Sequence, residues 1–349
     1  MDQTTGVTIS EVDVRNATDD ELTRLNTFSN ILRKESRPDE PPTPLEVTIA
    51  GVRNIPTFID VWAYIATPDG SDEIIASSQG TVLRTGENEH LFQCGVNVHP
   101  EWRRKGLAKA LLDPLVEIGE REGKTSLLFN TSARVPAGEE FAKRLGAKAG
   151  LVQRSSDLEM ANVDRDLIDR WVADGPRRAE GYQMVLFDGP YPTEEYERIC
   201  QCVNVMNTAP RDDLDVEDMN TTPEQMAEGE KALVAQGVQR WAFFIRHTES
   251  GRFVGYTDTY WHPSNPELVN QGGTGVDPGH RGHALGKWLK AAMVAKVLDE
   301  RPEAKCIRTS NAYSNDAMLG INTEMGFVEK YAETIWQLPV EEARTYLKG

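Results

Sequence analysis

Two stretches of the chain share one pattern: GVNVHPEWRRKGLAKALLDPLVEIG at residues 95–119 and TGVDPGHRGHALGKWLKAAMVAKVL at residues 274–298. A shift of 178 residues superimposes the first on the second, so that Val98 coincides with Val276 and Arg103 with Arg281. The shift is about half of the 349-residue chain. One long repeat of this kind predicts a duplicated domain rather than a solenoid of short repeats.

Both stretches are predicted to run from a strand through a basic turn into a helix. The helical part is predicted from apolar residues at steps of three and four, which form one buried stripe: Leu107, Leu111, Leu115 and Ile118 in the first copy, and Leu285, Leu289, Met293 and Val297 in the second. Small residues in the intervening turns let a ligand approach the backbone. Free N–H groups at a helix start favour an anion such as pyrophosphate.

The shared pattern, Val-x-Pro-x-x-Arg-x-x-Gly/Ala-x-Gly/Ala, resembles the acetyl-CoA-binding signature of the GCN5-related N-acetyltransferases (GNAT). Downstream, residues 306–327 are similar to the next strand and helix of that family, with Asn311 ending the strand and Asn315 opening the helix. Because both halves carry the pattern, the chain resembles the tandem members of the family and is mycothiol-synthase-like in architecture. The resemblance implies two α/β domains, each a twisted mixed sheet flanked by helices.

The resemblance also implies a function: acetyl-CoA is the co-substrate, and an amine of a small molecule attacks its thioester directly. The residues expected to hold the coenzyme are those that match the motif: Val98, Arg103, Arg104, Lys105, Gly106, Leu107 and Ala108 in the first copy, and Val276, Arg281, Gly282, His283, Ala284, Leu285, Gly286, Asn311 and Asn315 in the second. The first copy has more basic residues in its turn, whereas the second has the more complete late helix. Which half is active stays open.

The acid and base of the reaction are harder to assign. Many family members place a tyrosine four residues before the glycine that closes the late helix, but these positions hold Ala142 and Asn322. The catalytic candidates are therefore Glu89 and Asp258 as bases and Tyr313 as the acid. Further residues of suitable type near the motifs stay open as alternatives: Glu87, His90, His262 and Tyr331.

The repeat predicts an N-terminal domain at 1–163, a linker at 164–181 and a C-terminal domain at 182–349. The Pro-rich segment 35–44 is expected to be a surface connection or a lid. The four cysteines fit no zinc signature, and neither a metal nor a disulfide framework is expected.

Composition narrows the partners. The formal net charge of −17 argues against non-specific binding of nucleic acid. The chain has no long apolar run, and its first ten residues lack the features of a signal peptide, so we expect a cytoplasmic protein. Two other functions stay open, an acyl-CoA-binding protein without catalysis and a transferase for proteins or peptides. The oligomeric state is left open.

Overall fold

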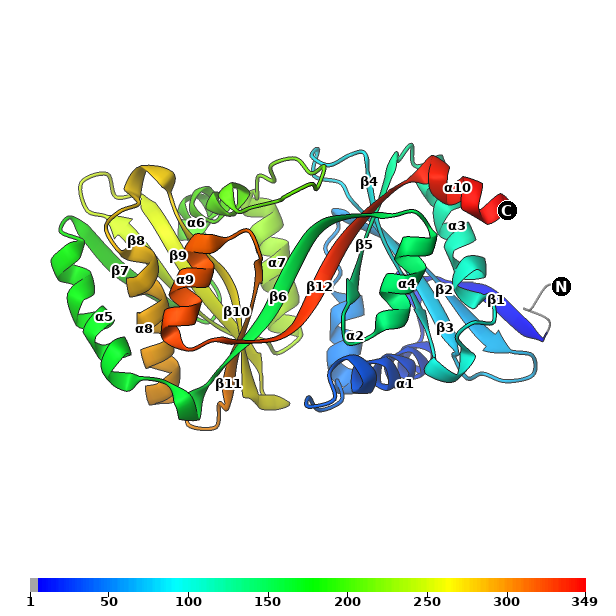
Figure 1. The fold of residues 1–349 in the computed structure, drawn as a ribbon, viewed down its shortest axis with the longest axis horizontal. Coiled ribbons are helices and arrows are strands. Elements are labelled where there is room, and N and C mark those ends of the chain that lie inside the picture. The colour runs from blue at the N-terminus through cyan, green and yellow to red at the C-terminus, as the bar shows by residue number, and fades with distance from the viewer. Residues whose placement is uncertain (1–5) are drawn as a thin grey trace. The chain divides into compact units, whose positions relative to one another are not determined.

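The computed structural model describes residues 6–349, which form two compact units (Figure 1). Unit 1 consists of the described residues up to 152 together with 212–217 and 332–349, and unit 2 consists of 153–211 and 218–331. The expectation of a cytoplasmic protein depends partly on the first ten residues, and residues 1–5 lie outside the described range. Among residues 6–349, no helix is long and apolar enough to cross a membrane.

The sheet of unit 1 has the strand order β1-β2-β3-β4-β5-β12. The strands are β1 (Val7–Val12), β2 (Ile59–Pro68), β3 (Ala76–Leu83), β4 (Leu91–Val98), β5 (Ser126–Ser132) and the C-terminal part of β12 (Val328–Pro339). Neighbouring strands are antiparallel, except that β4 and β5 run parallel. The motif strand β4 therefore lies at the one parallel step of the sheet.

Helices cover both faces of this sheet. On one face α1 (Asp19–Ser36) and α2 (Leu45–Arg53) bury Leu22 and Phe28 against β1 and β2. On the other face α3 (Leu107–Arg121) and α10 (Val340–Lys348) surround Phe92, and α4 (Pro136–Arg144) follows β5. A capping box of Thr18 and Glu21 fixes the start of α1.

The sheet of unit 2 repeats this order as β7-β8-β9-β10-β11-β6. Its strands are β7 (Tyr182–Asp188), β8 (Gln239–His247), β9 (Phe253–His262), β10 (Asn265–Val276), β11 (Cys306–Ala312) and the C-terminal part of β6 (Lys148–Glu159). Only β10 and β11 pair in parallel among the described pairs of this unit. The second motif strand, β10, thus takes the place that β4 has in unit 1.

The helices of unit 2 are also divided between two faces. Helices α5 (Arg165–Arg178), α8 (Leu285–Glu300) and α9 (Asp316–Met325) pack on a core around Leu158 and Ile307. Helices α6 (Tyr196–Val203) and α7 (Pro223–Ala235) cover a second, aromatic core around Phe244 and Tyr256. Short 3-10 helices complete the chain: η1 (Val14–Asn16), η2 (Pro100–Trp102), η3 (Met160–Asn162), η4 (Thr193–Glu195), η5 (Asn204–Thr208) and η6 (Pro278–His280). The predicted mixed α/β architecture with two related units is confirmed.

Each unit is completed by a strand from the other half of the sequence. Residues 333–339 of β12 pair with β5 in unit 1, and residues 153–159 of β6 pair with β11 in unit 2. The ranges 1–163 and 182–349 describe the predicted extents of the two sequence copies, and these domain bounds remain a prediction. The compact units differ from these ranges because the last strand of each half hydrogen-bonds in the sheet built by the other half. Residues 164–181, expected as a linker, mostly form α5, which packs on α8.

Candidate active site

In each unit the motif strand separates from its parallel neighbour after three residue pairs. Strand β4 pairs with β5 only at residues 91–93, and β10 pairs with β11 only at residues 268–270. The residues that follow keep an antiparallel partner on their other side. Their free edge presents backbone N–H and C=O groups that can bind an extended ligand.

The turns after the two motif strands have the same backbone shape. Residues 104 and 106 in unit 1 have φ of 66° and 83°, and residues 282 and 284 in unit 2 have φ of 89° and 58°. Each turn places glycine at one of its two left-handed positions, Gly106 in unit 1 and Gly282 in unit 2. No heavy atom of the described residues lies within 4 Å of where a Cβ on either glycine would be. The space above both turns is open to a ligand.

Helices α3 and α8 begin directly after these turns. Their N-caps, Gly106 and Ala284, supply no side-chain hydrogen bond, so the first N–H groups of both helices have no capping side chain. Together with the positive end of the helix dipole, these donors suit a phosphate group. The side chains of Leu107 and Leu285 are buried in the cores, so these two predicted residues offer a ligand only their backbone.

The arginine shared by both turns holds the turn in place. The Nε atom of Arg103 donates to the carbonyl oxygen of Val98 at 3.2 Å, and that of Arg281 donates to Val276 at 3.1 Å. Arg281 also donates to the hydroxyl of Thr208 at 2.9 Å. These contacts give both arginines a part in fixing the end of the motif strand, beside the anion contact expected from the sequence.

Ala284 has a left-handed conformation that an L side chain adopts at a cost of about 1–2 kcal/mol. We therefore expect Ala284→Gly to raise the free energy of unfolding by about 1 kcal/mol, measured by chemical denaturation. Ala295→Gly, inside the same helix α8, provides the control and is expected to lower it by about the same amount. Equal losses for both variants would contradict strain at Ala284.

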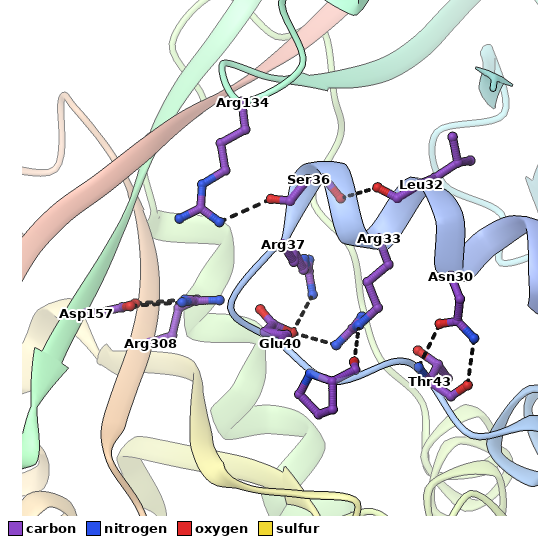
Figure 2. Close-up of polar contacts among 11 residues, drawn as sticks. Asn30, Leu32, Arg33, Ser36, Arg37, Glu40, Thr43, Arg134, Asp157 and Arg308 are labelled. Atoms are coloured by element: carbon purple, nitrogen blue, oxygen red, sulfur yellow. Dashed lines mark hydrogen bonds and ion pairs between the residues drawn. The ribbon is translucent and has the colours of Figure 1, made fainter. Parts of the chain in front are cut away.

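In unit 1 the end of α1 lies against the motif turn. Glu35 accepts hydrogen bonds from both terminal nitrogens of Arg103, one of them at 2.6 Å. Arg134, which follows β5, donates to the carbonyl oxygen of Ser36 at 3.1 Å (Figure 2). The guanidinium of Arg103 is thus neutralised by a carboxylate of its own unit, which leaves less positive charge at this turn than the sequence predicts.

The Pro-rich segment 35–44 is tied back to α1. Arg33 donates to the carboxylate of Glu40 at 2.5 Å, and the backbone N–H of Thr43 donates to the side chain of Asn30 at 2.7 Å (Figure 2). Side-chain contacts at both ends of the segment favour the interpretation as a connection over that as a lid.

The turn of unit 2 is surrounded by imidazole rings. The hydroxyl of Tyr182 lies 2.9 Å from Nδ1 of His280, and its ring centroid lies 5.3 Å from that of His283 and 5.3 Å from that of His247. The corresponding places in unit 1 hold Trp102 and Lys105, whose ammonium lies 4.3 Å from the indole centroid. An aromatic ring supports a basic side chain beside each turn.

Asp258 is the one sequence-predicted base that the structure buries beside an open motif strand. It lies on β9, is 7% exposed, and shares a face of the sheet with Tyr256 and Tyr260. The hydroxyl of Tyr260 donates to Oδ2 at 2.8 Å, whereas Oδ1 is buried without a hydrogen-bond partner among the described residues. Burial raises the pKa of Asp258 from 3.8 to about 6, although Tyr260 and the charge of Arg240 lower it.

Strand β10 bulges where it passes Asp258. The register between β9 and β10 shifts between Gln271 and Thr274. A Cβ on Gly272 would lie 2.4 Å from Oδ1 of Asp258, and one on Gly273 would lie 2.1 Å from the hydroxyl of Tyr256. Glycine at both positions therefore lets the exposed backbone of the open strand approach the unpartnered carboxylate oxygen.

Unit 1 has no carboxylate at the corresponding position. The residues that pair with the ends of the two motif strands are Ala76 and Gly255, so that Gln79 corresponds to Asp258. Gln79 is exposed, and β3 and β4 pair in continuous register without a bulge. Of the two described units, unit 2 is the one that combines an open motif strand with a buried carboxylate.

The other two catalytic candidates lie elsewhere. Glu89 precedes the paired end of β4, far from the turn at 103–106, and its carbonyl oxygen accepts a hydrogen bond from Lys124 at 2.7 Å. This position argues against Glu89 as the base, because β4 opens only beyond residue 93. Tyr313 follows β11 at the same end as the motif turn, is 42% exposed, and donates its hydroxyl to Glu329. This hydrogen bond raises the pKa of Tyr313, which makes it a weaker acid.

The two predicted asparagines, Asn311 on β11 and Asn315 at the start of α9, form hydrogen bonds within unit 2. The side-chain oxygen of Asn315 accepts a hydrogen bond from the N–H of Met318 at 3.2 Å and caps α9. Asn311 accepts one from Asn322. Lys290, which donates to Asn322, was not predicted from the sequence, and neither was the buried pair of Arg240 and Glu230 near Asp258. A comparison of the two copies could have identified Lys290, because the first copy has leucine at the equivalent position.

Comparison with known proteins agrees with this geometry. Residues 26–147 match the sequence profile of the acetyltransferase (GNAT) family. The mycothiol acetyltransferase of Saccharomonospora viridis is 28% identical over 210 residues, which cover 56% of this chain and 58% of that protein. The fold is similar to that of a tandem GNAT protein from the clavulanic acid biosynthesis pathway, with a TM-score of 0.76, 21% identity, and coverage of 96% of this chain and 98% of that one. A GCN5-related N-acetyltransferase from Sphaerobacter thermophilus gives a TM-score of 0.65 at 14% identity, over 95% of this chain and 96% of that one.

Two units, each with a motif strand that opens at one edge and a helix that starts uncapped beside it, define a tandem acyltransferase fold. The profile match falls in unit 1, and the structural similarity extends over both units. Residues 26–147 therefore carry the pattern of the acetyltransferase (GNAT) family, and the fold of the whole chain is similar to that of a tandem GNAT protein.

Proposed function

We propose that the protein transfers an acetyl group from acetyl-CoA to an amine of a small molecule, and that unit 2 holds the catalytic centre. The observation that carries this proposal is the buried carboxylate of Asp258 beside the open edge of β10. Unit 1 has the turn but no such carboxylate, so we assign it a non-catalytic role. The match of residues 26–147 to the GNAT family, whose members generally use acetyl-CoA, supports the choice of co-substrate.

The residues of unit 2 fit the coenzyme. The turn 281–284 and the uncapped start of α8 would hold its pyrophosphate, with open space above Gly282. The free edge of β10 would hold the amide groups of its pantetheine arm. When bound, acetyl-CoA supplies an acetyl group activated as a thioester. A backbone N–H near Val276 is the donor we assign to the thioester carbonyl.

The base must remove a proton from the attacking ammonium, because only the neutral amine is a nucleophile. With a pKa of about 6, Asp258 is ionised at neutral pH and still basic enough to accept that proton. Tyr260 occupies Oδ2, so the proton would go to Oδ1. The hydrogen bond from Tyr260 also fixes the orientation of the carboxylate.

The surroundings of Asp258 support a slender acceptor. The side chain is 7% exposed, and a Cβ on Gly275 would lie 2.5 Å from Cγ1 of Val205 in η5, so this part of β10 is closely covered. A primary amine on a narrow chain suits such an approach better than a folded protein surface does. The net charge of −17 suits a cationic acceptor.

Turnover of acetyl-CoA against a panel of small amines tests the proposal, and variants of the two turn glycines locate the reaction. Gly282→Val and Gly106→Val each place a side chain into open space at a positive φ, so their backbone strain is similar. We expect Gly282→Val to lower kcat/KM at least tenfold more than Gly106→Val. The reverse order would place the reaction in unit 1. Tight coenzyme binding without turnover of any amine would instead favour the acyl-CoA-binding protein.

A further inference from the structure

The core of unit 2 contains a buried lysine, Lys290, at a position where unit 1 has leucine. Lys290 on α8 is 1% exposed, and its ammonium lies 4.6 Å from the ring centroid of Phe327. Among residues 6–349, no carboxylate forms an ion pair with it. Burying an amine without a counter-charge is costly, and burial lowers the pKa of Lys290 to about 7.

Two asparagines, the buried Asn322 and the partly buried Asn311, connect this lysine to the open strands. The Nζ atom of Lys290 donates to Oδ1 of Asn322 at 2.6 Å, and Nδ2 of Asn322 donates to Oδ1 of Asn311 at 2.7 Å. Asn311 lies on the part of β11 that has already separated from β10, whose pairing ends at Arg308. The chain of hydrogen bonds therefore leads from the core of unit 2 to the opening between the two strands.

The direction of these hydrogen bonds is fixed by Lys290. In its protonated form Lys290 only donates, so the amide oxygen of Asn322 then faces it and the amide nitrogen faces Asn311. Asn311 then accepts with its oxygen, and its own N–H groups remain available to a ligand in the opening.

Unit 1 shows that packing does not require these polar groups. The repeat positions of Lys290 and Asn322 hold Leu112 and Ala142, which are buried at 3% and 0% exposure. The same helix pair is thus built there from apolar side chains. The hydrogen-bonded polar residues of unit 2 are costly to bury, and this cost points to a role in the candidate active site of unit 2.

We propose that Lys290 and Asn322 are positioning residues that direct the side-chain N–H of Asn311 toward the sulfur of coenzyme A bound in unit 2. This inference rests on the function proposed above. As the amine nitrogen bonds to the acetyl carbon, the carbon–sulfur bond breaks, and its electron pair goes to sulfur. Asp258 passes the proton of the ammonium to solvent before the attack and takes the second proton from nitrogen as the amide forms, and Asn311 stabilises the thiolate by donating a hydrogen bond until solvent protonates it.

The test measures the pKa of the thiol of bound coenzyme A from the ultraviolet absorbance of its thiolate. All proteins in the test carry Gly106→Val, which alters the turn of unit 1 and leaves the turn of unit 2 intact. The protein's own thiols stay protonated over the useful range, because burial raises the pKa of Cys94 and Cys202 to about 12 and of Cys200 and Cys306 to about 11. The double variant Lys290→Leu with Asn322→Ala transplants the pair of unit 1, which is known to pack. Lys296→Met, on the same helix, is the control, because it removes a partner of Glu300 and an ammonium over the ring of Trp241 but none of the contacts of Asn322.

We expect the double variant to raise the pKa of the bound thiol by about one unit and to lower kcat about tenfold with little change in KM for acetyl-CoA. Asn322→Asp keeps a partner for Lys290 but cannot donate to Asn311, so it should have the same effect. A thiol pKa that is unchanged in both variants would overturn the inference. A shifted thiol pKa in a protein that acetylates no amine would uphold it and contradict the proposed function instead.

Discussion

We expect Asp258→Asn to lower kcat by about 100-fold or more in the acetylation assay, because the amide cannot accept the proton of the attacking amine. The wild-type rate should fall on the acidic side of about pH 6, where Asp258 becomes protonated. The residual rate of the variant should lack this acidic limb. Profiles of kcat/KM against pH for both proteins measure the difference.

The same substitution should stabilise the fold. The pKa of Asp258 is about 6 in the native protein and 3.8 in the unfolded chain, so the unfolded chain releases its proton first as the pH rises. The contribution of Asp258 to native stability is therefore greatest below about pH 4 and falls as the pH rises through about 6. Asp258→Asn removes this fall, and we expect it to gain about 2–3 kcal/mol at pH 7 and nothing at pH 4. Denaturation at both pH values measures the gain.

Glu89→Gln is the matched control, since Glu89 is exposed and lies at the paired end of β4. We expect its kcat to stay within about twofold of the wild type. A large loss in Glu89→Gln together with a small loss in Asp258→Asn would move the reaction to unit 1 and contradict the assignment of the base. A variant of Asp258 that loses both activity and stability would point to a structural role.

Arg240→Met has the second large effect, on stability. The guanidinium donates to both carboxylate oxygens of Glu230, at 2.5 and 2.8 Å, and stacks 3.4 Å from the ring centroid of Tyr191. Both charged side chains are less than a tenth exposed. Removing the arginine leaves a buried carboxylate without its counter-charge, and we expect a loss of about 3–5 kcal/mol in the free energy of unfolding.

The loss of Arg240 should also change the pH profile. Its positive charge lowers the pKa of Asp258, so in Arg240→Met that pKa rises and the acidic limb of the profile moves to higher pH. Arg198→Met is the control, because Arg198 pairs with Glu195 at 3.2 Å on the surface and should cost less than about 1 kcal/mol. A loss of similar size in the two variants, with an unmoved acidic limb, would contradict this account of the buried pair.

The two motif segments could be predicted from sequence because their signals are local. The spacing of the apolar residues that begin with Leu107 and Leu285 defines the helices α3 and α8. The turn residues with positive φ lie at matching places in both copies, although glycine moves from Gly106 to Gly282. Local conformational preferences and helix periodicity produce the same sequence pattern in each half.

The catalytic candidates were less predictable. Asp258 and Glu89 both precede or flank a motif strand in the sequence. Only the pairing of β9 with β10, and the bulge at Gly272, bring Asp258 to an open edge, whereas the parallel pairing at 91–93 keeps Glu89 away from one. Lys290 lies in an apolar helix, and its partners Asn322 and Asn311 come from two later elements.

The sequence by itself determined that the chain is two copies of one α/β unit, each with a strand, a turn and a helix, because these features depend on neighbouring residues. Tertiary structure alone decided which strands complete each unit: β12 pairs with β5, and β6 with β11. It also decided that unit 2 holds a buried carboxylate with a raised pKa. Strand partners and burial depend on residues that lie far apart in the chain, so no local pattern encodes them.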